Sequence, residues 1–162
     1  MNEVEAEQLT RQLAAALQQR GQRICTAESC TGGLIAKTFT DLAGSSNWFD
    51  RGFVTYSNQA KIDMLGVSAQ TLQQYGAVSE QVAAEMAAGA ITHSEAQLAI
   101  AVTGIAGPGG GSELKPVGTV WFGFACDGEI TTQRQLFGGD RAAVREHSLL
   151  FAIHAMLQIL QK

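Results

Sequence analysis

The chain of 162 residues lacks clustered basic residues and long apolar segments. Its net charge is −4 and no two Lys or Arg residues are adjacent. Because proteins grip nucleic-acid phosphates with clustered Lys and Arg, nucleic acid is not expected as a main partner. Even the longest apolar runs, such as residues 149–153, are short. The N-terminus carries Glu3, Glu5 and Glu7 where a secretory signal has basic and then apolar residues. Neither a membrane-spanning segment nor a secretory signal is expected.

Cysteine and histidine are too few and too scattered to build a metal site or a disulfide framework. The cysteines are Cys25, Cys30 and Cys126, and the histidines are His93, His147 and His154. The sequence has no CxxC motif and no Cys/His spacing typical of structural zinc. We therefore expect no metal, free thiols in a reducing cytoplasm, and histidines at surface or half-buried positions.

Apolar strand patterns alternate with helical patterns along the chain, which is typical of the α/β class. With 46% hydrophobic residues, a chain of this length buries one substantial core, so we expect one domain over residues 1–162. The expected strands lie at 23–27, 49–56, 98–102, 117–125 and 129–137, and the expected helices at 34–42, 57–65, 79–91 and 140–160, after an opening helix. Asp127 and Gly128 predict a hairpin between the last two strands, so the sheet should be mixed.

Residues typical of helix ends mark several of these boundaries. Asn2 and Glu5 have the spacing of a capping box at the start of the opening helix, and Gly21 follows as a stop. Ser57 or Asn58 is suited to cap the helix that ends before Gly66, and Ser79 the helix that follows. Exposed apolar positions on the first and last helices leave room for a homodimer.

Ser29 lies where a buried strand gives way to a helix, and this junction is the most informative part of the chain. One reading makes Ser29 a helix cap; the other makes it a nucleophile beside N–H groups that stabilise negative charge. Gly32 and Gly33 have no β-carbon and would let a substrate approach the first turn, near Thr31. Cys30 is the rival nucleophile, but since cysteine is among the most buried residue types, the outward role is assigned to Ser29.

A nucleophilic serine needs a base, and Lys61 is the candidate. It follows the sequence Tyr56, Ser57, Asn58 and falls in the first turn of a short helix, whose positive end opposes its charge. Partial desolvation there would lower the lysine pKa toward the range that a general base needs. The alternatives are a solvated surface Lys61, and a Tyr56 that only packs.

Arg145 extends the apolar face of the last helix, counting about 100° per residue. That face consists of Leu149, Ile153, Met156 and Leu160. An arginine in such a place needs an anionic partner, either a ligand phosphate or carboxylate, or an internal glutamate such as Glu28. Arg141 shares the face and would assist, although an ion pair with Asp140 is equally open.

The glycine-dense segment 104–111 follows a buried strand and is a candidate ligand-contact loop. It fails the GxGxxG pattern because Leu114 stands three residues after Gly111, and it fails the P-loop pattern because Gly110 stands where lysine is needed. The segment therefore indicates a small polar or anionic ligand and no named nucleotide fold. Thr103, at its start, is placed to bond either the substrate or the turn.

Four ordered motifs resemble those of the CinA C-terminal domain family in its stand-alone form. They are AESCTGG at residues 27–33, YSNxxK at 56–61, GIAGP at 104–108 and KPVGTV at 115–120. The resemblance spans nearly the whole chain. It implies a three-layer α/β/α sandwich that hydrolyses the carboxamide of nicotinamide mononucleotide, a linear amide, to nicotinate mononucleotide and ammonia in pyridine-nucleotide (NAD) recycling. Larger relatives carry an additional N-terminal domain that this chain is too short to contain.

The resemblance places a serine/lysine pair at Ser29 and Lys61 and implies neither a cofactor nor a metal. The residues expected to bind substrate or support catalysis are Tyr56, Thr103, Arg145, Thr31, Gly32, Gly33, Asn58, Gly104 and Gly107. In the expected mechanism, neutral Lys61 takes the proton of Ser29, which attacks the carboxamide carbon, and N–H groups near residues 31–33 hold the oxyanion. Arg145 and the glycine loop bind the 5′-phosphate or orient the ring.

Two other functional classes fit parts of the sequence. A non-catalytic nucleotide-binding module would keep Arg145 and the glycines but has no need of Lys61 beside Ser29. An interaction protein of DNA uptake is suggested only by the name of the family, and the negative charge counts against it. The amidohydrolase is therefore the favoured hypothesis.

Overall fold

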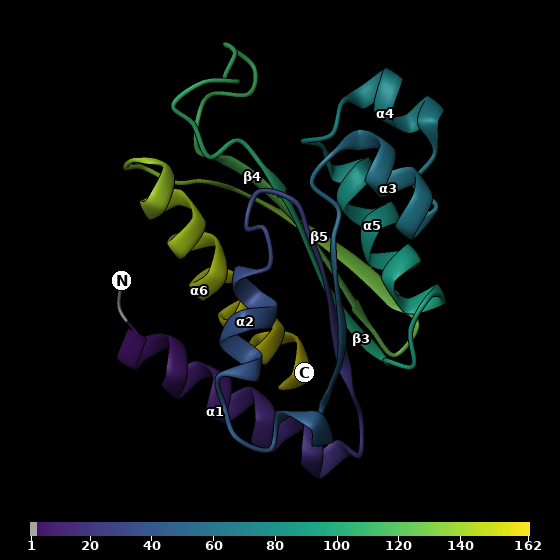
Figure 1. The fold of residues 1–162 in the computed structure, drawn as a ribbon, viewed down its shortest axis with the longest axis vertical. Coiled ribbons are helices and arrows are strands. Elements are labelled where there is room, and N and C mark those ends of the chain that lie inside the picture. The colour runs from purple at the N-terminus through teal and green to yellow at the C-terminus, as the bar shows by residue number, and fades with distance from the viewer. Residues whose placement is uncertain (1–2) are drawn as a thin grey trace.

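The computed structural model describes residues 3–162 and builds them around one five-stranded sheet in the order β2-β1-β3-β4-β5 (Figure 1). The strands are β1 (Ile24–Glu28), β2 (Phe49–Val54), β3 (Leu98–Gly104), β4 (Thr119–Cys126) and β5 (Glu129–Leu136). The first three strands are parallel to one another, β4 is antiparallel to its neighbour β3, and β5 is antiparallel to β4. The sheet is mixed, as the hairpin signal predicted.

Helices cover both faces of the sheet, which confirms the three-layer α/β/α sandwich (Figure 1). They are α1 (Glu3–Arg20), α2 (Leu34–Thr40), α3 (Asn58–Leu65), α4 (Ala69–Tyr75), α5 (Glu80–Thr92) and α6 (Arg141–Leu160), with a short 3-10 turn at Ser45–Asn47. One layer holds α1, α2 and α6, and the other holds α3, α4 and α5. Two apolar cores result, one on each side of the sheet.

The two central parallel strands explain why their sequences are nearly continuous apolar runs. All five residues of β1 are buried, and so are six of the seven residues of β3. A strand covered by helices on both faces has no solvent-exposed side, so the alternation typical of half-exposed strands is lost. Edge strand β5 is exposed at most of its positions.

The turn and cap signals in the sequence are confirmed by the backbone. Asp127 and Gly128 have positive φ angles of 51° and 87°, as a two-residue hairpin turn requires. The side chains of Ser57, Ser79 and Asp140 accept N–H bonds at the starts of α3, α5 and α6. The capping box of Asn2 and Glu5 includes a residue outside the described part of the chain.

Helix α4 lies within residues 67–78, where no helix or strand was predicted. Only Leu72 of its seven residues is buried, so the sequence of this two-turn helix has no apolar periodicity that would predict it. Ser68 caps its start and Gly76 follows its end. Within residues 3–162 no helix is long and apolar enough to cross a membrane.

The topology brings three chain segments to one edge of the sheet. Because β1, β2 and β3 are parallel, their carboxyl ends at Glu28, Val54 and Gly104 lie at the same edge. The segments that follow these ends carry all four motifs or lead into them. In open α/β sheets, ligands bind at this edge.

Candidate active site

Ser29 and Lys61 meet at the carboxyl edge of the sheet. Ser29 directly follows β1, and Lys61 lies in the first turn of α3, seven residues after the end of the neighbouring strand β2. Lys61 Nζ donates a hydrogen bond to Ser29 Oγ over 3.0 Å. The two residues are 32 positions apart in sequence, so the pairing of parallel strands β1 and β2 brings them together.

Lys61 is buried without an anionic partner. Its side chain is 1% exposed, and its ammonium also donates to the carbonyl oxygens of Thr55 at 2.8 Å and Tyr56 at 3.4 Å. Among residues 3–162 no carboxylate forms an ion pair with it. Burial penalises the charged form and lowers the pKa of Lys61 below its ordinary value. The solvated surface lysine is therefore wrong, and burial makes Lys61 lose its proton more readily than an exposed lysine does.

Ser29 does not cap α2, so the reading of this serine as a helix cap is wrong. The helix begins only at Leu34, and its cap residue Gly33 makes no side-chain hydrogen bond. Residues 29–33 form a turn in which both Gly32 and Gly33 have positive φ. The Ser29 hydroxyl is thus left to Lys61.

The carboxylate of buried Glu28 caps the start of α2 in place of Ser29. It accepts hydrogen bonds from the Thr31 hydroxyl and from the N–H groups of Gly33, Ile35 and Ala36, at distances of 2.8 to 3.2 Å. A negative charge at the positive end of a helix is further stabilised by the helix dipole. The last residue of β1 therefore shapes the turn that carries Ser29.

Replacing Glu28 with glutamine is expected to lower the free energy of unfolding by about 2 kcal/mol, because an amide NH2 then faces buried N–H donors. Urea denaturation followed by circular dichroism measures this loss. Glu7→Gln is the control, since Glu7 pairs with Arg11 at an exposed surface and its loss should change stability by less than about 0.5 kcal/mol. Equal stabilities of the two variants would contradict the capping role.

Cys30 faces the interior and is poorly suited as the nucleophile. Its side chain is 6% exposed, and burial raises the pKa of the thiol to about 11. A β-carbon on Gly104 would lie 3.1 Å from the Cys30 sulfur and 2.7 Å from a methyl group of Val120. Gly104 thus allows β3 to pack against the turn at residues 29–33.

Arg145 binds backbone carbonyl groups of the Ser29 turn. Its Nε donates to the carbonyl of Cys30 at 3.2 Å, and its Nη2 donates to the carbonyl of Thr31 at 3.1 Å. Within residues 3–162 it forms no ion pair with Glu28, so that alternative is wrong. The predicted apolar face of α6 is confirmed, since Leu149, Ile153 and Met156 are fully buried.

Arg141, expected only to assist Arg145, lines the cavity over Ser29 itself. Its Nη2 donates to the Tyr56 hydroxyl at 3.0 Å and its Nη1 to the carbonyl of Gly107 at 2.9 Å. Asp140 instead caps α6 through the N–H of Ala143, so the ion pair between Asp140 and Arg141 is not formed. The position of Arg141 one turn before Arg145 was the only sequence signal for this role.

The remaining predicted residues divide between the cavity and its walls. Thr103 donates to the carbonyl of Ala77 at 2.8 Å, which ties β3 to the segment before α5. Asn58 and Tyr56 are exposed at the rim. All three histidines are exposed, as expected.

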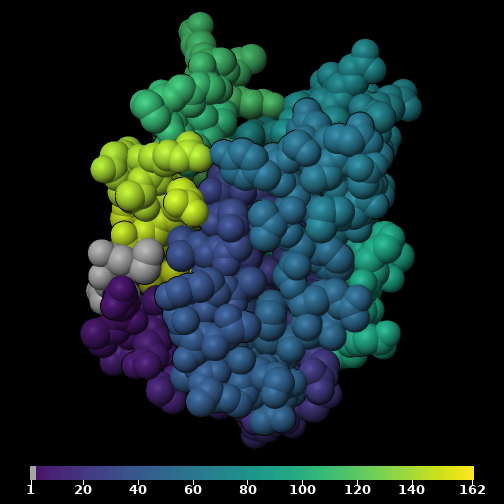
Figure 2. All heavy atoms as spheres, in the orientation of Figure 1, coloured from purple at the N-terminus to yellow at the C-terminus, as the bar shows by residue number. Residues whose placement is uncertain are grey.

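A cavity of about 250 Å³ lies over Ser29 and Lys61. It is lined by Ser29, Cys30, Tyr56, Asn58, Lys61, Ala77, Val78, Thr103, Gly104, Ala106 and Arg141. Neither an Asp nor a Glu is among these residues, whereas both Lys61 and Arg141 are. Arg141 and Ala106 also line an adjoining hollow at the start of α6, together with Arg145. At this end of the molecule the loop near residues 108–115 and the α3–α4 region project as separate lobes (Figure 2).

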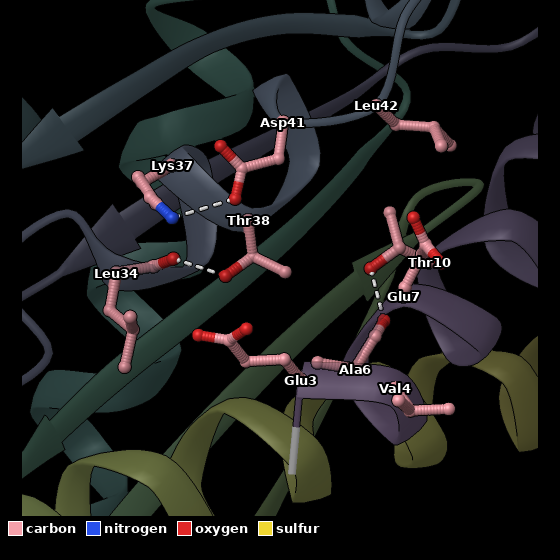
Figure 3. A pocket seen from close by; sticks show the side chains of 10 residues that line it. All are labelled: Glu3, Val4, Ala6, Glu7, Thr10, Leu34, Lys37, Thr38, Asp41 and Leu42. Atoms are coloured by element: carbon pink, nitrogen blue, oxygen red, sulfur yellow. Dashed lines mark hydrogen bonds and ion pairs between the residues drawn. The ribbon is translucent and has the colours of Figure 1, made fainter. Parts of the chain in front are cut away.

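A second cavity, of about 450 Å³, lies between α1 and α2, away from this edge (Figure 3). Several of its polar side chains already have partners: Lys37 pairs with Asp41 at 2.7 Å, and Thr38 donates to the carbonyl of Leu34. Its lining contains neither a serine nor a cysteine to act as nucleophile. The Ser29 cavity is therefore the candidate active site.

The three-layer fold with a buried lysine bonded to a serine at the sheet edge defines an α/β protein with an enzyme-like site. The particular family follows from comparison with known proteins. Residues 6–160 match the model of the CinA C-terminal domain, and the chain belongs to this family.

Two curated relatives and one solved structure match the chain over nearly their full length. The chain is 57% identical to the nicotinamide-nucleotide amidohydrolase PncC of Enterobacter agglomerans, over 98% of this chain and 97% of that protein. It is 55% identical to the protein of the same name from Escherichia coli K12, over 98% and 96%. The crystal structure of competence/damage inducible protein CihA from Agrobacterium tumefaciens superposes with a TM-score of 0.93 at 48% identity, covering 98% of this chain and 96% of that one. The resemblance stated from the motifs is confirmed.

Proposed function

We propose that this chain hydrolyses the carboxamide of nicotinamide mononucleotide to nicotinate mononucleotide and ammonia, with Ser29 as nucleophile and Lys61 as base. The observation that supports the chemistry is the 3.0 Å hydrogen bond between a buried, unpaired lysine and the serine hydroxyl. The substrate is supported by the whole-length likeness to two proteins named nicotinamide-nucleotide amidohydrolase. The proposal treats residues 1–162 as one domain working in a reducing cytoplasm, which suits its three free cysteines.

In the first half of the reaction, neutral Lys61 takes the proton of Ser29 as Oγ bonds to the carboxamide carbon. The carbonyl electron pair moves onto oxygen and forms a tetrahedral oxyanion. The N–H group of Gly32 donates to the Ser29 carbonyl and that of Gly33 to the Glu28 carboxylate, so neither is free to bind the oxyanion. The oxyanion is instead assigned to the N–H groups of Cys30 and Thr31.

In the second half, the oxyanion re-forms the carbonyl and the C–N bond breaks. Lys61 returns its proton to the nitrogen, so ammonia leaves and an acyl ester remains on Ser29. Lys61, neutral again, takes a proton from water as the water oxygen attacks the ester carbon. Breaking the C–O bond to Ser29 then releases the carboxylic acid and restores the serine hydroxyl when Lys61 gives back its proton.

The charge around the cavity orients the nucleotide. The carboxamide lies at Ser29, and the 5′-phosphate lies toward Arg141, the guanidinium that lines the same cavity. Arg141 already bridges Tyr56 and Gly107 across the cavity, so its guanidinium is held where a phosphate can replace or join these partners.

The direct test incubates the purified chain with nicotinamide mononucleotide and measures ammonia, with and without EDTA. We expect ammonia and nicotinate mononucleotide in equal amounts and no effect of EDTA, because neither half-reaction uses a metal ion. Binding of the nucleotide without ammonia release would favour a non-catalytic nucleotide-binding module. Release that EDTA abolishes would contradict the serine/lysine mechanism while leaving the amidohydrolase activity in place.

A further inference from the structure

We propose that Arg145 is a positioning residue that keeps the oxyanion-binding N–H groups of Cys30 and Thr31 unpaired and fixed in direction. The inference rests on the proposed function, because it names what the Ser29 turn needs in order to stabilise the oxyanion. It gives Arg145 a role through the backbone and leaves recognition of the phosphate to Arg141.

Two adjacent backbone donors in the Ser29 turn have no partner in another described residue. Of the eight N–H groups in residues 29–36, six donate hydrogen bonds within the protein. They are those of Ser29, Gly32, Gly33, Leu34, Ile35 and Ala36. The N–H groups of Cys30 and Thr31 donate to no other residue in the described range 3–162. Backbone donors in buried segments are rarely left without a partner, so two adjacent free donors beside a nucleophile indicate a binding site for an oxygen atom.

The carbonyl groups of Ser29, Cys30 and Thr31 in the same turn all accept hydrogen bonds. The carbonyl of Ser29 accepts from the N–H of Gly32 at 3.0 Å, and the carbonyl of Thr31 accepts from the N–H of Leu34 at 3.0 Å. Arg145 supplies the remaining donors, to the carbonyls of Cys30 and Thr31. Cys30 is 115 positions away from Arg145 in sequence, so α6 fixes the turn from outside.

Peptide planarity links these acceptors to the free donors. The carbonyl of Cys30 and the N–H of Thr31 belong to one planar trans peptide and point in opposite directions, so holding the first fixes the second. The carbonyl of Thr31 belongs to the same peptide as the N–H of Gly32, and this N–H donates to the carbonyl of Ser29. The carbonyl of Ser29 in turn belongs to the same peptide as the N–H of Cys30. The two donors of Arg145 therefore determine the direction of both free N–H groups.

The side chain and its surroundings suit this role. The guanidinium is planar with donors in a rigid fork, so it can hold two successive carbonyls at once, which an ammonium cannot do with the same geometry. A β-carbon on Gly32 would lie 3.7 Å from Arg145 Nη2, so the guanidinium lies closely over the turn. Arg145 is not among the residues lining the cavity over Ser29, whereas Arg141 is.

Replacing Arg145 with methionine is expected to lower kcat by about 10²-fold, the loss typical of one oxyanion donor, while KM changes by less than about threefold. The kcat of Arg145→Lys should lie between those of the wild type and Arg145→Met, because one ammonium can satisfy the two carbonyls only in part. Arg141→Met is the matched contrast on the same helix face, and it should mainly raise KM. Calorimetric binding of nicotinamide mononucleotide to Ser29→Ala, with and without Arg145→Met, should give equal affinities.

A different division of effects overturns the inference. If Arg145→Met weakens nucleotide binding in the Ser29→Ala background and leaves kcat intact, Arg145 binds substrate. Amide NMR tests the turn without any substrate: Arg145→Lys should move the Cys30, Thr31 and Gly32 amide resonances and speed their hydrogen exchange. Unchanged resonances contradict the inference, whereas a wild type that releases no ammonia contradicts only the proposed function. The lysine variant keeps the test valid should the methionine variant fail to fold.

Discussion

Ser29→Ala is expected to abolish ammonia release, lowering kcat by about 10⁴-fold or more, because no other side chain can form the acyl ester. The hydroxyl accepts from Lys61 and is 9% exposed, so it points into the cavity without being required by the core. The variant should keep its fold and its affinity for the nucleotide. A coupled ammonia assay measures the rate, and circular dichroism with calorimetry verifies the fold and the binding.

Cys30→Ala provides the matched control for this substitution. The Cys30 thiol lines the same cavity and is the rival nucleophile next to Ser29, and burial raises its pKa to about 11. Its removal should leave most of the activity, within about tenfold, because a packing contact is lost and no reacting group is. Near-normal turnover by Ser29→Ala, or loss of turnover in Cys30→Ala alone, would transfer the nucleophile to Cys30.

The position of the site was predictable because it depends on chain connectivity. The buried strands predicted at 23–27 and 98–102, each followed by glycines, belong in the structure to a parallel pair whose ends meet at one edge. Capping residues then place α3 so that Lys61 falls in its first turn. These are local signals, and the structure confirms the strands, the hairpin and the two-sided covering of the sheet.

The partners of individual side chains were not predictable from local sequence. Ser29 looked like a cap because the sequence does not show that the turn runs on to Gly33, or that buried Glu28 bonds the helix start from the preceding strand. Arg145 was assigned an anionic partner, yet it bonds two carbonyls contributed by a distant turn. Such contacts exist only once α6 packs beside α2, and no periodicity in the chain encodes them.

Lys61→Met is expected to lower kcat by about 10³-fold, within the range for loss of a general base. Methionine has a similar length and no charge, so it fills the buried site without a new polar group. In the wild type, kcat/KM should rise with pH as Lys61 loses its proton, and the midpoint of this rise should lie below the ordinary lysine pKa because burial lowers it. A pH profile of ammonia release measures the midpoint. An unchanged rise in the residual activity of Lys61→Met would assign this titration to another group.

The same substitution should also change how stability depends on pH. The folded-state pKa of Lys61 is lowered from its ordinary value of 10.5, so in the range between the two the unfolded chain binds the extra proton. Unfolding is then linked to proton uptake, and the free energy of unfolding rises with pH across that range. Below the folded-state pKa the buried ammonium destabilises the protein, so Lys61→Met should lose this rise and be relatively most stable at low pH. Urea denaturation of both proteins from pH 6 to 10 measures the difference. Parallel pH dependences would show that Lys61 keeps its ordinary pKa in the fold and would remove the neutral amine on which the mechanism depends.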